Sequence, residues 1–278
     1  LIFISSLFFF TSSFAQKNKA GDAKIIDSLK QLYNKKEPLS LNGYKMLTLH
    51  YNNVFNPDSL DIVLHDYKKE AENQKSELHL SKVLANRALY FAKQNKIDSA
   101  LYYFKKQYYH KGSVIKDKQR ALNNIAICFR FLKQPDSSIV YVKKGLNLAK
   151  KLKYDLGVLD GYIELSNITT NKEIGVKYAD SALQFVRLKP NLYNIQNKVI
   201  AILYKLGEFS VDNKDYLKAK NFFKQTLDSC YKYKENYIQI HTNNEISQCY
   251  VELNQPDSAR YYLTKNLNNP LFEKNKRV

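Results

Sequence analysis

The chain has 278 residues, of which 44% are hydrophobic, with only 8 glycines, 6 prolines and no tryptophan. This composition suits helices and argues against a β-rich, turn-dense fold, and the length allows one elongated array or two compact domains. The formal net charge is +18, and lysine supplies all but six of the 44 basic residues. No arginine cluster, glycine-rich loop or recognition-helix motif accompanies the lysines, so solvated helix faces explain the charge better than nucleic-acid recognition does.

The N-terminal residues resemble a targeting signal. An uncharged apolar run extends from Leu1 to Phe14, and Ser13-Phe14-Ala15 places small residues where a signal peptidase reads them. The pattern predicts a signal peptide over residues 1–15, cleaved before Gln16, and incomplete because the chain begins with Leu and lacks a basic segment. The alternative is an uncleaved membrane anchor that has lost its first half, since so short a run cannot span a bilayer. Either way, we expect the rest of the chain to lie in the periplasm.

The next segment, residues 16–40, predicts a single helix before a break. Apolar residues recur at helical spacing between Gly21 and Lys36, and Pro38 then interrupts the pattern. The stripe consists of Ile25, Ile26, Leu29, Leu32 and Tyr33.

From residue 41 to residue 268 the pattern becomes a series of paired helices. The second helix of a pair often opens with Asp-Ser, as at Asp58, Asp98, Asp136 and Asp257, where a carboxylate favours the helix dipole. A small or modest apolar residue and a large one four positions later then share one helix face. The expected contacts are Leu47 and Tyr51 with Leu60 and Leu64; Leu84, Ala88 and Phe91 with Ala100 and Phe104; Leu122, Ile125, Ala126 and Phe129 with Ser138, Val142 and Leu146; Tyr162, Leu165 and Ser166 with Gly175, Ala179, Ala182 and Leu183; Leu203, Leu206 and Gly207 with Ala219, Phe223 and Leu227; and Ile246, Ser247 and Tyr250 with Ala259, Leu263 and Leu267.

These pairs repeat with a nearly constant period. The equivalent positions are 60, 100, 138, 175, 219 and 259, which gives a period of about 40 residues. A period of this size indicates stacked supersecondary units, none of which can bury its apolar face alone.

The repeated register resembles the tetratricopeptide repeat family. In the clear copies the small residue of the first helix precedes that of the second by a constant interval, as in Ala88 and Ala100 or Gly207 and Ala219. Arg87 stands at a usually apolar position, and Gln107, Thr226 and Asn266 replace a common alanine. The resemblance implies an all-α, tetratricopeptide-like α-solenoid, a right-handed superhelix of antiparallel helix pairs with about five to six repeats. An unrelated α-solenoid is the alternative.

The same resemblance implies a concave groove, lined by the first helices, that holds a peptide or another protein. The pattern carried over from the family assigns to the groove Lys82, Arg120, Asn123, Ile127, Arg130, Tyr204, His241, Asn244 and Gln248. Arg120, Asn123 and Arg130 form the most promising polar cluster, able to meet a carboxylate or backbone amides. The family's chaperone-tail clamp needs a Lys and, four positions later, an Asn, which Ala85/Leu89 and Asn123/Ile127 do not provide.

Nothing in the sequence predicts an enzyme, a metal or a cofactor. The five histidines lack metal-ligand spacing, and no serine or cysteine lies in a nucleophile motif. The spacing of Cys128, Cys230 and Cys249 matches no metal motif. We expect them to be buried free thiols, although an exported protein could join two of them in one disulfide.

The combination of a signal peptide with long-period repeats resembles the exported sensory region of Bacteroidetes-type histidine kinases and regulators. Residues 269–278 would then begin a further helix or a truncated tail, with a C-terminal effector and a membrane tether missing. We therefore expect a non-catalytic, protein-binding sensory module. A free-standing exported scaffold is one alternative, and a basic nucleic-acid-binding repeat is a weaker one, because no polar code recurs at the groove positions.

Overall fold

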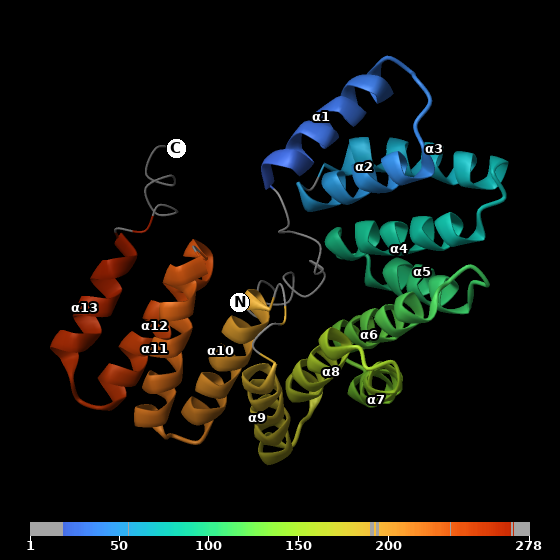
Figure 1. The fold of residues 1–278 in the computed structure, drawn as a ribbon. Helices are drawn as coiled ribbons and strands as arrows, with labels where there is room; N and C mark the ends of the chain where they lie inside the picture. Colours follow the sequence, from blue (N-terminus) through green and yellow to red (C-terminus); the bar gives the residue numbers. More distant parts are fainter. Residues whose placement is uncertain are drawn as a thin grey trace. The chain divides into compact units, whose positions relative to one another are not determined.

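The computed structural model describes residues 19–54, 56–189, 192, 195–233, 235–267 and 269. The described residues form thirteen α-helices and no strand (Figure 1). The helices are α1 (Lys19–Asn34), α2 (Leu41–Asn53), α3 (Pro57–Asn73), α4 (Glu77–Lys93), α5 (Ile97–Tyr109), α6 (Ile115–Phe131), α7 (Pro135–Lys151), α8 (Asp155–Ile168), α9 (Lys172–Leu188), α10 (Gln196–Asp212), α11 (Tyr216–Tyr233), α12 (Asn236–Glu252) and α13 (Pro256–Leu267). The predicted all-α repeat solenoid is confirmed. The predicted signal peptide, residues 1–15, lies outside the described residues, as do residues 270–278.

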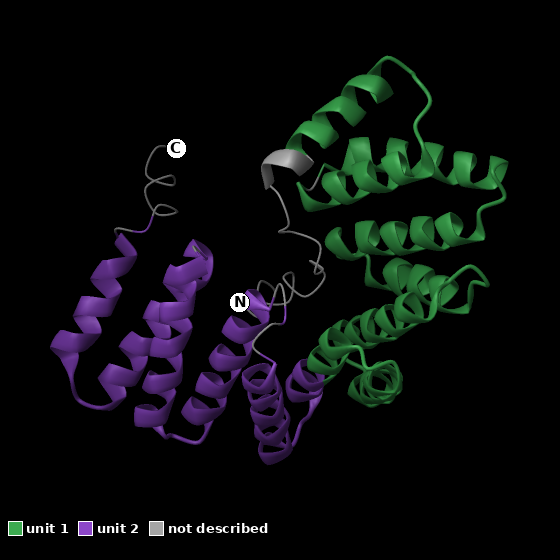
Figure 2. Ribbon diagram, viewed as in Figure 1, with its two compact units in different colours: residues 1–161 green, residues 162–278 purple. Residues whose placement is uncertain are grey.

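The chain divides into two compact units, residues 1–161 (unit 1) and residues 162–278 (unit 2), with the boundary inside α8 (Figure 2). After α1, the helices follow one another as six pairs. We call α2, α4, α6, α8, α10 and α12 the first helices, and their partners α3, α5, α7, α9, α11 and α13 the second helices. Within each unit, a helix packs mainly on its neighbours in the sequence.

The recurring aspartates lie at helix starts, as the sequence predicts. Asp58, Asp98, Asp136 and Asp257 each occupy the first turn of a second helix. The side chain of Asn56 also caps α3 by accepting a hydrogen bond from the Ser59 amide at 3.1 Å. These acidic residues therefore stabilise helix ends through the dipole.

The small residues lie where the two helices of a pair cross. Ala88 and Ala100 are fully buried, and the Ser138 hydroxyl donates to the Ala126 carbonyl at 2.7 Å across the equivalent crossing. At Gly207 even a methyl group would clash, because its carbon would come within 2.5 Å of the Phe223 ring. The predicted register therefore identifies the positions of closest helix approach.

A second regularity joins the helices of a pair through stacked aromatic rings. Phe91 stacks on Tyr103, Phe129 on Tyr141 and Tyr250 on Tyr262, with ring centroids 5.4, 5.3 and 5.6 Å apart. In each case the two partners are separated along the chain by the same interval that separates the small residues. The tyrosines of the repeated Asp-Ser segment thus pack against the first helix rather than only filling the core.

Two predicted core residues are wrong. Leu263 and Leu267 of α13 are 50% and 55% exposed, whereas Phe104, which has the register position of Leu263 in α5, is fully buried. The outer face of a second helix is covered by the pair that follows it, and Asn269 is the only described residue after α13. Ile25 of α1 is likewise 48% exposed although it belongs to the predicted apolar stripe.

Helix ends in this chain do not use glycine. Lysine or asparagine occupies the left-handed position after seven of the described helices, at Lys36, Lys75, Asn95, Lys133, Lys153, Lys214 and Asn254, and no described glycine has a positive φ. Each end is a Schellman motif: after α6, for example, the Gln134 amide donates to the Phe129 carbonyl and the Lys133 amide to the Arg130 carbonyl. Glycines are thus reserved for close packing, as at Gly207.

Candidate functional site

Unit 1 holds a charged network on its first helices. Lys82 of α4 forms an ion pair with Asp117 of α6, whose side chain is only 6% exposed. On the next turn of α6, the Arg120 guanidinium lies 3.9 Å from Asp117 and donates to the Tyr154 hydroxyl at 3.2 Å. These four residues, which we call the Arg120 network, connect α4, α6 and the residue that precedes α8.

Local structure explains how the Arg120 network is placed. Asp117 lies in the first turn of α6, where the helix dipole favours a carboxylate, and Arg120 follows three positions later on the same face. The Tyr154 amide closes the Schellman turn after α7 by donating to the Ala149 carbonyl at 2.9 Å. The Arg120 side chain remains 40% exposed.

The other predicted groove residues of α6 have different surroundings. Asn123 is buried, and its side-chain oxygen faces α7 so closely that a methyl group at Gly145 would lie 2.3 Å from it. Ile127 is also buried, inside the core that surrounds Phe104 and Phe129. The guanidinium of Arg130 packs over the Phe131 ring at 4.9 Å. The structure thus links Arg120 to Lys82 through Asp117, a residue that sequence reasoning missed.

The contact between α2 and α4 is also polar. The Asn52 amide donates to the Asn86 side-chain oxygen at 3.2 Å, and Lys93 donates to the Asn52 carbonyl. Burial lowers the pKa of Lys93. These amide contacts hold the first helices of unit 1 together.

Unit 2 presents different chemistry on its first helices. The Tyr204 hydroxyl of α10 donates to Glu245 of α12 at 3.3 Å, and Lys205 forms an ion pair with Glu208 at 3.0 Å. Burial, and to a smaller extent the charge of Glu208, raise the pKa of Glu245. Burial also raises the pKa of the Tyr204 hydroxyl. A carboxylate pair therefore occupies in unit 2 the helix faces that carry lysine and arginine in unit 1.

The remaining predicted groove residues all lie on α12. His241 packs against the Tyr237 ring at 4.6 Å, and burial lowers its pKa. Asn244 and Gln248 are exposed: Asn244 accepts a hydrogen bond from Asn266 at 2.8 Å, and Gln248 donates to Glu252 at 3.0 Å. Binding by any of the nine predicted groove residues stays a prediction.

The described part of the chain offers no metal site, because no three potential ligands among its His, Cys, Asp and Glu residues come together. Cys128, Cys230 and Cys249 are free and buried, and burial raises their pKa to about 12, 12 and 11. These thiols are therefore unsuited to ionise or to bind metal. Of the helices that the structure describes, none combines the length and apolar character needed to cross a membrane.

One shallow hollow of about 80 Å³ lies in unit 2 between α9, α10 and α11. Asp180, Asp215, Lys218, Phe209 and Phe222 are among the residues that line it. It is too small to hold a peptide, so we do not assign it a function.

No protein-family model matches the chain, and no curated protein matches its sequence. Solved structures do match. A signal transduction ATPase of the STAND class with a tetratricopeptide repeat sensor, from Pyrococcus horikoshii, gives a TM-score of 0.63 at 15% identity over 94% of this chain, which spans 42% of that protein. The apo quorum sensor NprR from B. thuringiensis gives 0.64 at 17% identity, covering 90% of this chain and 75% of NprR.

A Rap protein in complex with Competence and Sporulation Factor also matches, with a TM-score of 0.63 at 16% identity, covering 89% of this chain and 76% of that one. NprR matches a second time in complex with its cognate peptide NprX. At identities this low, these likenesses establish the tetratricopeptide-like fold of the chain and nothing finer.

Proposed function

We propose that the chain is a non-catalytic module that binds a peptide or an extended segment of another protein on its first helices. The observation that carries the proposal is the Arg120 network, in which a buried carboxylate holds two cationic side chains and the Arg120 side chain is 40% exposed. Such a pre-organised guanidinium can donate to a ligand carboxylate or to backbone carbonyls at little cost in side-chain entropy. The NprR complex with its cognate peptide offers a precedent for peptide binding on this fold.

The binding test uses the whole chain and a library of random twelve-residue peptides. We expect it to enrich sequences with an acidic residue or a free C-terminal carboxylate. Arg120→Gln should weaken the enriched peptides about tenfold or more in fluorescence anisotropy, since a hydrogen bond to a charged group contributes about 1.5–3 kcal/mol.

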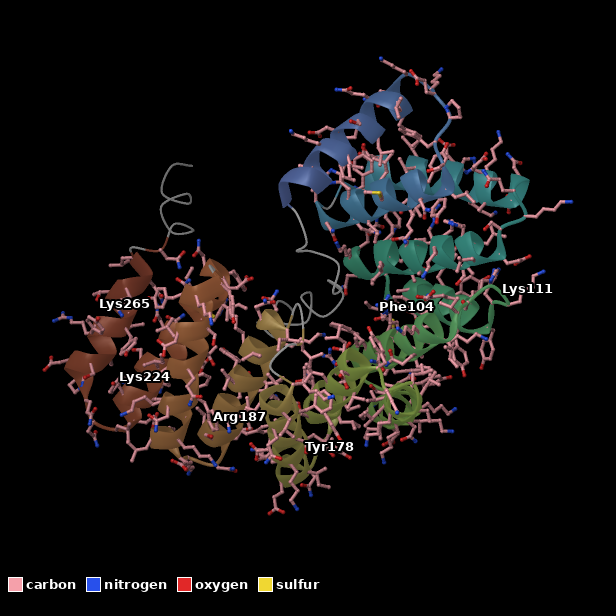
Figure 3. All side chains as sticks on the ribbon, in the orientation of Figure 1. Phe104, Lys111, Tyr178, Arg187, Lys224 and Lys265 are labelled. Carbon is pink, nitrogen blue, oxygen red and sulfur yellow. The ribbon has the colours of Figure 1, made fainter. Side chains whose placement is uncertain are left out.

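Arg187→Gln is the matched control for this test. Arg187 is exposed on α9 of unit 2 (Figure 3), so the substitution removes the same charge away from the Arg120 network. Equal loss of affinity in both variants, with unchanged circular dichroism, would contradict the assignment of the site. Failure to enrich any sequence over an unrelated helical repeat would contradict peptide binding itself.

We further propose that this module is the sensory part of an exported, periplasmic signalling protein. The apolar run of residues 1–14 supports export, and two of the proteins with matching structures contain or are sensors: the STAND ATPase with its tetratricopeptide repeat sensor and the quorum sensor NprR. Residues 1–40 are preceded by Met-Lys-Lys, which supplies the missing basic segment, and fused to alkaline phosphatase, which is active only after export. This fusion should yield active enzyme in a bacterial host. A fusion that stays inactive while accumulating in the cytoplasm would overturn the export proposal.

A further inference from the structure

The last three helices of unit 2 carry a surface that the proposed function does not use. Lys220 and Lys224 of α11 place their ammonium groups 4.9 and 5.7 Å from the centre of the Tyr250 ring. Tyr250 of α12 stacks on Tyr262 of α13, and Lys265 lies 5.5 Å from the Tyr262 ring. Figure 3 labels Lys224 and Lys265 on their two helices. We call these five residues the lysine–tyrosine patch.

The lysines of this patch are held in place without carboxylate partners. In the part of the chain that the structure describes, no carboxylate lies within ion-pair distance of Lys220, Lys224 or Lys265. A hydrogen bond to the Tyr250 hydroxyl is the largest cause that raises the pKa of Lys224, and a hydrogen bond to the Tyr261 hydroxyl is the largest cause that raises the pKa of Lys265, so both stay charged. Glu252, the acidic residue that ends α12, interacts instead with Tyr216. Asp228 lies one turn after Lys224 on α11.

Unit 1 also has lysines over a pair of stacked aromatic rings. Lys105 lies 5.2 Å from the Phe129 ring, which stacks on Tyr141, and Lys144 lies 5.3 Å from Tyr141. The sequence interval between the stacked rings is the same in both units, and in each a lysine stands three positions after the second ring. The placement of lysine over the aromatic stack is therefore a feature of the helix pair and not a result of randomly scattered charge. Unit 1 has phenylalanine in place of Tyr250 and thus one hydroxyl fewer.

The geometry decides which anionic partner fits. Single-stranded nucleic acid gains affinity by stacking bases on open aromatic faces. Here the rings of Tyr250 and Tyr262 face each other or an ammonium group, so they are not free to stack on a base. The donors that remain are ammonium groups, which attract anions as compact point charges and need no stacking surface.

We infer that the lysine–tyrosine patch binds an acidic segment, rich in aspartate and glutamate, of a partner protein. This surface lies on α11, α12 and α13 and shares no residue with the Arg120 network of unit 1. The two proposed sites can therefore be tested separately, and Arg120→Gln should leave binding at the patch unchanged.

The test measures anisotropy of a fluorescein-labelled 15-residue polyglutamate with a C-terminal amide, beside polyglutamine and oligothymidine of the same length. Every measurement uses the full chain carrying Arg120→Gln, so that acidic residues bound at the Arg120 network do not contribute. Polyglutamate should bind and polyglutamine should not. The triple variant Lys220→Gln/Lys224→Gln/Lys265→Gln should weaken polyglutamate binding at least about tenfold. Tyr250→Phe/Tyr261→Phe keeps the rings but removes the hydroxyls that bond Lys224 and Lys265, and should weaken it about two- to fivefold.

The matched control is Lys69→Gln/Lys96→Gln/Lys177→Gln, which removes the same charge from three exposed lysines outside the patch. It should change the affinity less than about twofold, as long-range charge is screened by salt. Equal loss in the two triple variants would overturn the proposal in favour of diffuse charge. If oligothymidine binds more tightly than polyglutamate, and the triple variant of the patch loses that binding, the proposal of an acidic protein partner is wrong. A Lys→Arg triple at the patch, which retains the charge, should keep polyglutamate binding and exclude misfolding as the cause of any loss.

Discussion

The two units build the same helix pairs but give their first helices opposite character. In unit 1, Lys82 and Arg120 surround the buried Asp117, whereas in unit 2 Tyr204 donates to Glu245, which has Glu208 as a neighbour. The residues at the helix crossings are small in both units, because the backbones must approach closely there. The repeat therefore constrains how helices pack and leaves the first-helix faces free to differ, which is where we expect binding specificity to reside.

The largest expected difference is between α5, a second helix inside unit 1, and α13, the last described helix of unit 2. Phe104→Ala should lower the free energy of unfolding by about 3–5 kcal/mol, because the ring is fully buried and its removal leaves a cavity. Leu263→Ala, at the equivalent position of α13, should change it by about 0.5 kcal/mol or less, because half of Leu263 is exposed. Urea unfolding followed by circular dichroism measures both. A comparable loss for Leu263→Ala would mean that another segment covers α13.

Asp117 and Glu245, the acids of the two first-helix faces, should respond oppositely to neutralisation. Asp117→Asn removes the charged partner of Lys82 and should cost about 1–3 kcal/mol at neutral pH. Glu245→Gln should instead stabilise unit 2 at neutral pH. Burial raises the pKa of Glu245 in the folded protein above its ordinary value of 4.5. As pH rises, Glu245 therefore loses its proton in the unfolded chain before it does so in the folded protein. Between these two pKa values the wild type loses stability with rising pH.

Urea midpoints at pH 4 and pH 7.5 distinguish these cases. The advantage of Glu245→Gln over the wild type should be small at pH 4 and larger at pH 7.5. If both substitutions destabilise the protein equally at pH 7.5, the contrast between the two faces is wrong.

The smallest effect should be the same in both units. Lys133 and Lys214 end α6 and α10 with positive φ values of 57° and 59°, a conformation that costs a side chain about 1–2 kcal/mol relative to glycine. Glycine at either position removes this cost but also adds entropy to the unfolded chain, which offsets part of the gain. The net effect should be a rise in the free energy of unfolding of about 0.5–1 kcal/mol. Lys151→Gly, inside the last turn of α7, is the control and should lower it by a similar amount. A loss of stability in Lys133→Gly or Lys214→Gly would contradict the Schellman assignment.

Much of the fold could be predicted because its determinants are local and repeated. The Asp-Ser helix starts, the break before residue 41 and the constant interval between small residues all depend on spacing along one or two adjacent helices. The predicted groove list was less informative about contacts. It included Asn123 and Ile127, which are buried, and it omitted Asp117 and Tyr154, which position Arg120.

By itself, the sequence determined the class of fold, the register of the repeats and the positions where helices cross, since helical periodicity and side-chain size suffice to predict them. Only the tertiary structure decided that Lys82 pairs with Asp117, which lies on a different helix, and that Leu263 is exposed while Phe104 is buried. It also decided that lysines lie over stacked tyrosines. These contacts depend on which neighbouring helix covers a given face, and no spacing within one helix carries that information.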